Sequence, residues 1–156
     1  MGSLLTGVET AKALSQVWQI PLIGVNHLEG HLFAPLLDAD DLEPPFLSLI
    51  VSGGHTEIIC VRNYGKYELL GQTRDDAAGE AYDKIARAIG LGYPGGTKVE
   101  KAALAGDPEF YAFPRAKIDE AKYDFSFSGV KSAVLNTINS YKMKGLEIDK
   151  KFQADI

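Results

Sequence analysis

Two of the chain's three histidines, His27 and His31, stand four residues apart in the segment NHLEGHLFAPLL. Side chains at i and i+4 share one face of a helix, so both imidazoles could bind one metal ion. The zinc-protease motif HExxH has this spacing, but its general base is a glutamate directly after the first histidine. Here Leu28 holds that position, and Glu29, one residue later, projects to another side of the helix. The pair therefore predicts a metal site without protease chemistry; the alternative is one histidine in a core and one in solvent.

A second candidate is the segment Ser52-Gly53-Gly54-His55, which follows an apolar run. One interpretation is a hairpin turn that needs glycine for positive φ. The other is an anion-binding loop in which Ser52 and successive backbone N–H groups donate to phosphate oxygens. It is not a Walker A loop, because the Gly-Lys-Ser/Thr sequence is absent. In either case His55 could contact a ligand or only complete the turn.

Weaker signals lie further along the chain. Asp83 stands in an apolar-striped helical pattern, where an aspartate is usually solvated, and Gly95-Gly96 follows Pro94, as in many plain turns. Together with the first Gly-Gly loop, these residues would suit a cleft with phosphate at one wall and ribose at the other. Glu100, four residues past Gly96, could then reach a ribose hydroxyl.

The elements that must position these residues follow from periodicity and turn signals. We expect a helix over residues 4–18, a buried strand over 20–25, and a helix capped by Asn26 that carries the histidines. A β-meander should follow, with strands over 46–51, 56–61 and about 67–73. Further helices are expected after Asp75-Asp76, ending at Gly90 or Gly92, after a tight turn at 94–96, and from about Val130.

Composition sets broad limits. The chain has 156 residues, 46% hydrophobic and 24% charged, which is typical of a globular protein with one compact domain or parts of two. A net charge of −5 does not indicate a basic surface that would bind nucleic acid. The single cysteine, Cys60, excludes an intramolecular disulfide. No apolar run is long enough to predict a membrane span. An apolar stripe at Ile148, Phe152 and Ile156 stops without a C-cap, so we expect an internal part of a longer protein.

Five strings in order resemble one known family: GVETAKAL, PLIGVNHLEGHLFAPLL, LIVSGGHTEII, ELLGQTRDDAAGEAYDKIARAIGLGYPGG and FSFSGVKSAVL. This family is the bacterial-type tRNA N6-adenosine threonylcarbamoyltransferases, formerly called O-sialoglycoprotein endopeptidases. The resemblance implies an α/β, two-lobed fold of the sugar-kinase, Hsp70 and actin (ribonuclease H-like) type. Residues 1–40 would then be the end of the first lobe, with the metal-binding helix, and residues 41–156 the start of the second.

The resemblance also implies roles for individual residues. His27 and His31 would hold one divalent ion, with Fe²⁺ as the first choice and Zn²⁺ as the second. The substrate threonylcarbamoyl-AMP would be bound by Ile50, Val51, Ser52, Gly53, Gly54, His55, Asp83, Gly96 and Glu100. Ile50 and His55 replace a tyrosine and an asparagine of archaeal and eukaryotic members, which indicates the bacterial or organellar type.

The implied reaction is transfer of the threonylcarbamoyl group to N6 of the adenosine beside the anticodon in tRNAs that read codons starting with A. The ion would polarise the carbamoyl oxygen, and AMP would leave. Implied partners are tRNA, a degenerate paralogue and an ATPase subunit, in the cytoplasm or an organelle, with no membrane. A further aspartate ligand falls outside these residues, so the chain alone is expected to be inactive.

Three alternatives remain beside this interpretation. A metalloprotease is disfavoured by the position of Glu29. A small-molecule kinase of the same superfamily would keep the Gly-Gly loops but would have no use for the histidine pair. A non-catalytic paralogue or interaction module would lack that pair as well. His27 and His31 therefore discriminate the transferase from the kinase and the paralogue, and the position of Glu29 discriminates it from the protease.

Overall fold

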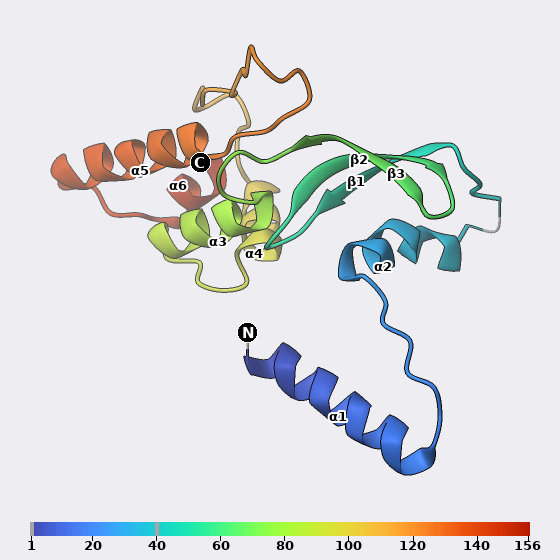
Figure 1. Cartoon of the computed structure of the whole chain (residues 1–156). Coiled ribbons are helices and arrows are strands. Elements are labelled where there is room, and N and C mark those ends of the chain that lie inside the picture. The colour runs from blue at the N-terminus through green and yellow to red at the C-terminus, as the bar shows by residue number, and fades with distance from the viewer. Residues whose placement is uncertain (1, 40) are drawn as a thin grey trace. The chain divides into compact units, whose positions relative to one another are not determined.

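The computed structural model describes residues 2–39 and 41–156. Its contacts divide the chain into two compact units, Met1–Asp41 and Leu42–Ile156. The first unit contains α1 (Gly2–Trp18), α2 (His27–Phe33) and the short 3-10 helix η1 (Ala34–Leu37). The second contains a three-stranded sheet and helices α3 to α6 (Figure 1). The chain is thus a mixed α/β structure with a small antiparallel sheet.

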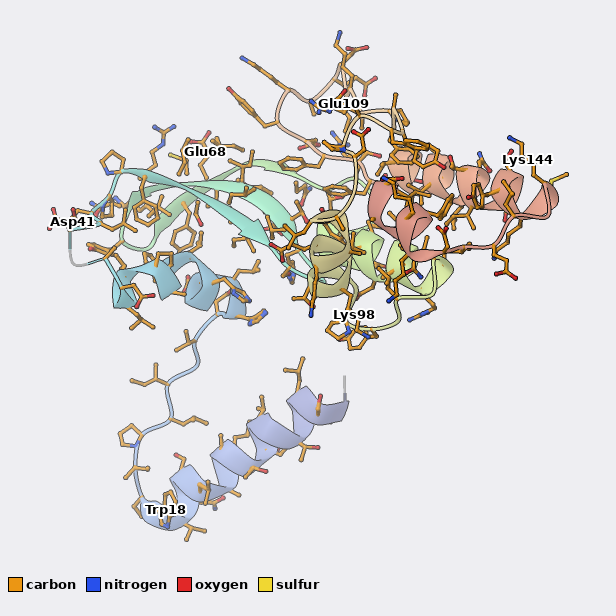
Figure 2. All side chains as sticks on the ribbon, turned by 180° about the vertical axis from the view of Figure 1, so that it is seen from behind. Trp18, Asp41, Glu68, Lys98, Glu109 and Lys144 are labelled. Carbon is orange, nitrogen blue, oxygen red and sulfur yellow. The ribbon has the colours of Figure 1, made fainter. Side chains whose placement is uncertain are left out.

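Helix α1 confirms the helix predicted from the apolar spacing of its sequence. None of its described residues is buried, and Leu4 and Trp18 are 75% and 62% exposed. Figure 2 shows its side chains, with Trp18 near the end of the helix. The apolar spacing fixes the helical conformation, but it does not by itself supply a partner for the apolar face.

The prediction of a strand over residues 20–25 is wrong. This segment is extended but forms no β-ladder in the part of the chain that the structure describes, and Ile23 is 81% exposed. A strand is defined by hydrogen bonds to a neighbour, and the described ladders all join β1 (Phe46–Val51), β2 (Thr56–Asn63) and β3 (Lys66–Gln72). An apolar run becomes a buried strand only where a neighbouring strand can form hydrogen bonds with its backbone.

Asn26 caps α2, as its sequence position predicted. Its side-chain oxygen accepts a hydrogen bond from the backbone N–H of Leu28 at 2.9 Å, which is the usual N-cap contact. Leu32 is 1% exposed and is the buried residue of this short helix. The cap fixes where the helix begins and therefore which residues share the face of His27.

The predicted β-meander is confirmed. β1, β2 and β3 are antiparallel neighbours in chain order, and Val51 pairs with Thr56, so residues 52–55 form the hairpin loop between β1 and β2. Between β2 and β3, Gly65 has φ +70°, a left-handed conformation that favours glycine. The register therefore places the Ser-Gly-Gly-His segment at the end of the sheet from which α3 begins.

Helices α3 (Ala78–Ala88), α5 (Ser128–Met143) and α6 (Lys150–Asp155) pack around one apolar core, and α4 (Gly95–Ala103) packs against α3 and α6. The core residues, each at most 3% exposed, are Ile89, Val134, Ile138 and Phe152. Gly90, with φ +82°, follows α3 and confirms one of the two predicted ends. No helix among the described residues is long and apolar enough to cross a membrane.

Two predicted boundaries need correction. Pro94, Gly95 and Gly96 do not form a tight turn: Pro94 is the N-cap of α4, and both glycines lie in its first turn. Pro-Gly-Gly is compatible both with a tight turn and with the start of a helix, so the sequence pattern could not distinguish the two. Helix α5 begins at Ser128, slightly before Val130, and two residues separate it from the bridge between Phe125 and Thr73 that ends the extended segment.

Candidate functional site

The two histidines of α2 face each other, as their spacing predicted. The Nε2 atoms of His27 and His31 are 3.2 Å apart, and the ring centroids are 4.5 Å apart with a 73° angle between the planes. Both side chains are exposed. The alternative in which one histidine packs in a core is therefore wrong.

This distance fits two ligands of one ion. Two nitrogens that bind a tetrahedral ion at about 2.0–2.1 Å lie about 3.3 Å from each other. The 3.2 Å separation of the His27 and His31 Nε2 atoms matches that value, and it also suits an imidazole N–H···N hydrogen bond when no ion is bound. Paired imidazoles suit zinc and iron. The donor set and its geometry thus fit a divalent transition metal.

The pair supplies two coordination positions. Within residues 2–39 and 41–156, no group of three or more histidine, cysteine, aspartate or glutamate side chains is placed to hold an ion. Structural zinc sites use four protein ligands, whereas catalytic sites use fewer and leave positions open. His27 and His31 would thus be two ligands of a site of either kind, and a third protein ligand outside these residues stays a prediction.

The loop at 52–55 is closed by its own hydrogen bonds. The backbone N–H of Ser52 donates to the carbonyl oxygen of His55 at 2.8 Å. Ser52 Oγ accepts from the N–H groups of Gly54 at 3.2 Å and His55 at 3.0 Å. In this conformation the hydroxyl therefore organises the loop, and these two N–H groups point inward. Donation by successive N–H groups to a phosphate, as predicted, would require Gly54 and His55 to exchange Ser52 Oγ for the ligand.

The glycines of this loop are not explained by backbone conformation. Residues 52–55 do form the predicted hairpin turn, but neither Gly53 nor Gly54 has a positive φ, so the predicted reason for glycine at these positions is wrong. A Cβ atom on either residue would meet nothing within 4 Å. Their outer side is thus open backbone that another molecule can approach closely. Of the two strand residues before the loop, Ile50 is 5% exposed and Val51 is 56% exposed.

Helix α3 begins against this loop. The backbone N–H of Gly79 donates to the carbonyl oxygen of Ser52 at 3.1 Å, and the N–H of Ala78 donates to Thr56 Oγ1 at 2.9 Å. Thr56 is only 2% exposed. The first N–H groups of a helix have no partner inside it, and here two of them bind the loop and the strand that follows. Sequence reasoning missed Thr56 and Gly79.

Asp83 connects α3 to α4. Its Oδ1 accepts a hydrogen bond from the backbone N–H of Gly95 at 2.6 Å, so the carboxylate caps α4 from the neighbouring helix. Asp83 is half-buried and bonded, which corrects the solvated alternative. A Cβ on Gly96 would meet nothing within 4 Å, and Glu100 is exposed one turn later. Gly96 and Glu100 therefore share an open face of α4.

The acidic pair before α3 has a structural role. Asp75 accepts from Ser126 Oγ at 2.5 Å and from the N–H of Phe127 at 2.8 Å. Partial burial raises the pKa of Asp75, but the hydrogen bonds from Ser126 and the nearby backbone N–H groups outweigh it and lower the pKa overall. Asp76 binds Lys131 and, at 2.7 Å, Lys84, and these hydrogen bonds lower its pKa. The two carboxylates hold α3 and α5 together.

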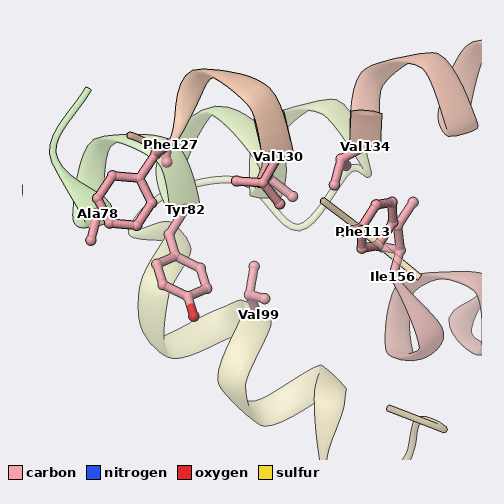
Figure 3. Close-up of a pocket in the computed structure, with 10 residues that line it drawn as sticks. Ala78, Tyr82, Val99, Phe113, Phe127, Val130, Val134 and Ile156 are labelled. Carbon is pink, nitrogen blue, oxygen red and sulfur yellow. The ribbon is translucent and has the colours of Figure 1, made fainter. Parts of the chain in front are cut away.

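An apolar pocket of about 280 Å³ lies between α3, α4 and α5 (Figure 3). Figure 3 shows Tyr82 and Phe127 near one end and Phe113 and Ile156 near the other. None of the polar site residues predicted from the sequence lines it. The pocket is therefore a separate feature from the loop at 52–55 and the open face of α4.

The order of these features along the chain also matches a known family. The model of the TsaD family, tRNA N6-adenosine threonylcarbamoyltransferase, matches residues 1–156. The chain belongs to this family. This confirms the resemblance drawn from the five ordered strings of the sequence.

Curated relatives agree with the family match. A tRNA N6-adenosine threonylcarbamoyltransferase of Clostridium kluyveri (strain ATCC 8527) is 60% identical over 151 residues, which are 96% of this chain and 44% of the relative. One from Clostridium perfringens (strain SM101) is 57% identical over 150 residues, again 96% and 44%. One from Desulfitobacterium hafniense (strain Y51) is 60% identical over 145 residues, 93% and 42%. The chain thus spans less than half the length of these relatives.

Within this family member the predicted residues fall into two groups. The loop at 52–55, Asp83 and Gly96 are joined through α3 and the start of α4 in the unit Leu42–Ile156. His27 and His31 belong to the unit Met1–Asp41. Thr56 and Gly79, which the prediction omitted, carry a usable signal: a threonine directly after the loop and a glycine in the first turn of an alanine-rich helix.

Proposed function

We propose that the protein containing this chain transfers the threonylcarbamoyl group from threonylcarbamoyl-AMP to N6 of the adenosine beside the anticodon. Its acceptors are tRNAs that read codons starting with A. The observation that carries this proposal is the family match over residues 1–156. Because the chain spans less than half of its relatives, the activity belongs to the whole protein, and the 156-residue chain alone is expected to be inactive.

His27 and His31 would hold the metal ion of this enzyme, Fe²⁺ as the first choice and Zn²⁺ as the second. The support is the 3.2 Å separation of their Nε2 atoms and the preference of both ions for imidazole. A bound divalent ion would supply Lewis-acid polarisation of the carbamoyl oxygen. The chain's own contribution is to keep the two rings on one face of α2, which Asn26 fixes by capping the helix.

The unit Leu42–Ile156 would bind the adenylate. The proposed contacts are the backbone of residues 50–54, with His55, and the open face of α4. Support comes from the free space at Gly53, Gly54 and Gly96, where a phosphate or sugar can approach the backbone. Glu100 is an exposed carboxylate that can accept hydrogen bonds from ribose hydroxyls. Asp83 Oδ1 holds the start of α4, so its Oδ2 is the oxygen left for a ligand.

The reaction balances without another reactant. The N6 amine of adenosine attacks the carbamoyl carbon, a new N–C bond forms, and the bond from that carbon to the AMP phosphate oxygen breaks. AMP leaves with the electron pair, and N6 loses one proton, which AMP or water takes up. The loop at 52–55 would bind the phosphate that becomes the leaving group, so binding there stabilises the charge that develops on it.

The whole protein is proposed to have a two-lobed fold of the sugar-kinase, Hsp70 and actin type. It would act in the cytoplasm with a degenerate paralogue and an ATPase subunit, which the same family resemblance implies. The family match supports these proposals, and the mixed α/β structure with a small antiparallel sheet is compatible with that fold.

A complementation experiment tests the proposed function. A bacterial strain depleted of its own enzyme would express the full-length protein, and nucleosides from its bulk tRNA would be quantified by mass spectrometry. We expect threonylcarbamoyladenosine to return with the parent protein. A variant with both His27→Ala and His31→Ala, expressed at the same level, should not restore it. A parent protein that leaves the nucleoside absent, beside a complementing relative, would contradict the proposal.

A further inference from the structure

We propose that Thr56 and Gly79 are positioning residues that hold the two ends of the loop at 52–55 against α3, where the loop backbone can receive the adenylate phosphate. This inference rests on the proposed function of that loop. Neither residue would contact the substrate through a side chain, because Thr56 is 2% exposed and Gly79 has no side chain. Both would act through the loop backbone.

Gly79 is in close contact with the loop backbone. A Cβ atom at this position would lie 2.7 Å from the carbonyl oxygen of Ser52 and 2.9 Å from both N and Cα of Gly53. All three are backbone atoms, so no flexible side chain can move aside. Opening these contacts to the 3.4 Å of ordinary van der Waals contact would displace the loop from α3 by about 0.5–0.7 Å. Only glycine lets the loop and helix meet here.

Thr56 makes the second connection. Its hydroxyl accepts the N–H of Ala78 at 2.9 Å, and its carbonyl oxygen accepts the N–H of Thr73 at 2.9 Å. It therefore binds both the first turn of α3 and the segment that leads into that helix. The N–H of Gly79, the next residue along, donates to Ser52 at the opposite end of the loop. The two ends of the loop are thus held to successive backbone N–H groups of one helix.

The loop's own hydrogen bonds close its turn, but they do not fix its position against α3. Gly53 and Gly54 have no side chains to pack, and nothing surrounds their Cβ positions within 4 Å. A phosphate-binding loop acts by the placement of its backbone groups, and a misplacement of about 1 Å can cost on the order of a hundredfold in catalysis. A shift of about half that size at Ser52 and Gly53 should therefore weaken adenylate binding measurably.

The test compares variants of the full-length protein by calorimetric binding of threonylcarbamoyl-AMP without tRNA. Gly79→Ala introduces the clash, and Thr56→Val removes the hydroxyl while keeping its volume. Both should raise the dissociation constant about tenfold or more, with metal content unchanged. Thr56→Ser keeps the hydroxyl and should restore binding to within about twofold of the parent.

Two controls separate positioning from general loss of stability. Gly129→Ala makes the same chemical change in a helix where a Cβ meets nothing within 4 Å, and it should leave binding unchanged. Ile138→Val weakens the core far along the chain from the loop, and it should lower the melting temperature without changing the dissociation constant. If Gly79→Ala does not fold, the comparison of Thr56→Val with Thr56→Ser decides the question.

The outcomes distinguish this inference from the proposed function. Parent-like binding by folded Gly79→Ala and Thr56→Val, beside a parent that binds the adenylate, would overturn the positioning role alone. A parent that does not bind the adenylate, while its metal site is filled, would overturn the proposed function of the loop and this inference with it. Weakened binding in Ile138→Val equal to that in Thr56→Val would also overturn it, because loss of stability would then explain both.

Discussion

Replacing Asp75 by alanine should destabilise the junction between α3 and α5. Its two carboxylate oxygens accept hydrogen bonds from Ser126 Oγ at 2.5 Å and from the N–H of Phe127 at 2.8 Å, so it caps α5 from about fifty residues away in the sequence. Loss of a cap costs about 0.5–2 kcal/mol. Loss of one further side-chain hydrogen bond costs about 0.5–1.5 kcal/mol. Because Asp75 is exposed to solvent, we expect a total of about 1–2.5 kcal/mol.

The assay is urea unfolding of the full-length protein, with hydrogen exchange of the first amides of α5 as the local readout. Asp75→Asn keeps one acceptor oxygen for Phe127 and should cost about half as much as Asp75→Ala. Asp119→Ala is the matched control, because Asp119 is 86% exposed and its only described ion pair, with Lys117, is 3.9 Å long. It should cost less than about 0.5 kcal/mol. Equal midpoints for Asp75→Ala and Asp119→Ala, with unchanged exchange in α5, would refute the capping role.

Further outcomes follow from the same structure. His27→Ala should remove most of the bound metal from the full-length protein while leaving its circular dichroism unchanged, since the exposed ring supports no core; metal analysis showing full occupancy would contradict this. Gly54→Val should weaken adenylate binding without lowering the melting temperature, because its Cβ meets nothing within 4 Å; parent-like affinity would restore the plain-turn interpretation. Asp76, Asp124 and Asp155 have lowered pKa values, mainly through hydrogen bonds to Lys131, to the N–H of Gln72 and to Lys151 respectively. Groups with depressed folded-state pKa values stabilise the protein above their unfolded value of about 3.9, and this stability is lost as pH falls through the folded-state values. As the pH is lowered below about 4, the urea concentration at the unfolding midpoint should therefore decrease in the parent, and it should decrease less in Asp76→Asn. Identical pH profiles of the two proteins would contradict the contribution of Asp76 to stability. Phe152→Ala should cost about 3–5 kcal/mol by chemical denaturation, because the ring is 3% exposed in the core; a cost below about 1 kcal/mol would contradict that packing.

Local signals in the sequence predicted the elements that depend on local physics. Asn26, which precedes apolar residues at helical spacing, predicted the start of α2. The apolar strand segments and the turn at Gly65 predicted the β-meander. The spacing of His27 and His31 predicted one shared helix face, and their Nε2 atoms do lie 3.2 Å apart. Each of these features is set within a few residues, so the sequence alone contains the information.

Features that depend on distant partners were not predictable in this way. The run at 20–25 has the composition of a strand, but no ladder forms on it among the described residues. Asp83 reads as a solvated helix residue until Gly95 is placed beside it. Gly79 reads as a weak helix position until the backbone of Ser52 and Gly53 is seen to leave no room for a side chain. Contacts between elements decide these roles, and the propensities of single residues do not predict such contacts.

The central claim is that this chain is part of an enzyme that modifies tRNA from an adenylate donor. The most direct measurement incubates the purified full-length protein and its partner proteins with synthetic threonylcarbamoyl-AMP and unmodified tRNA. Modified adenosine and released AMP are then quantified together. We predict equal amounts of both products with the parent protein, and neither above background when His27 and His31 are both replaced by alanine. AMP release without tRNA modification, or modification that persists in the double variant, would contradict the account.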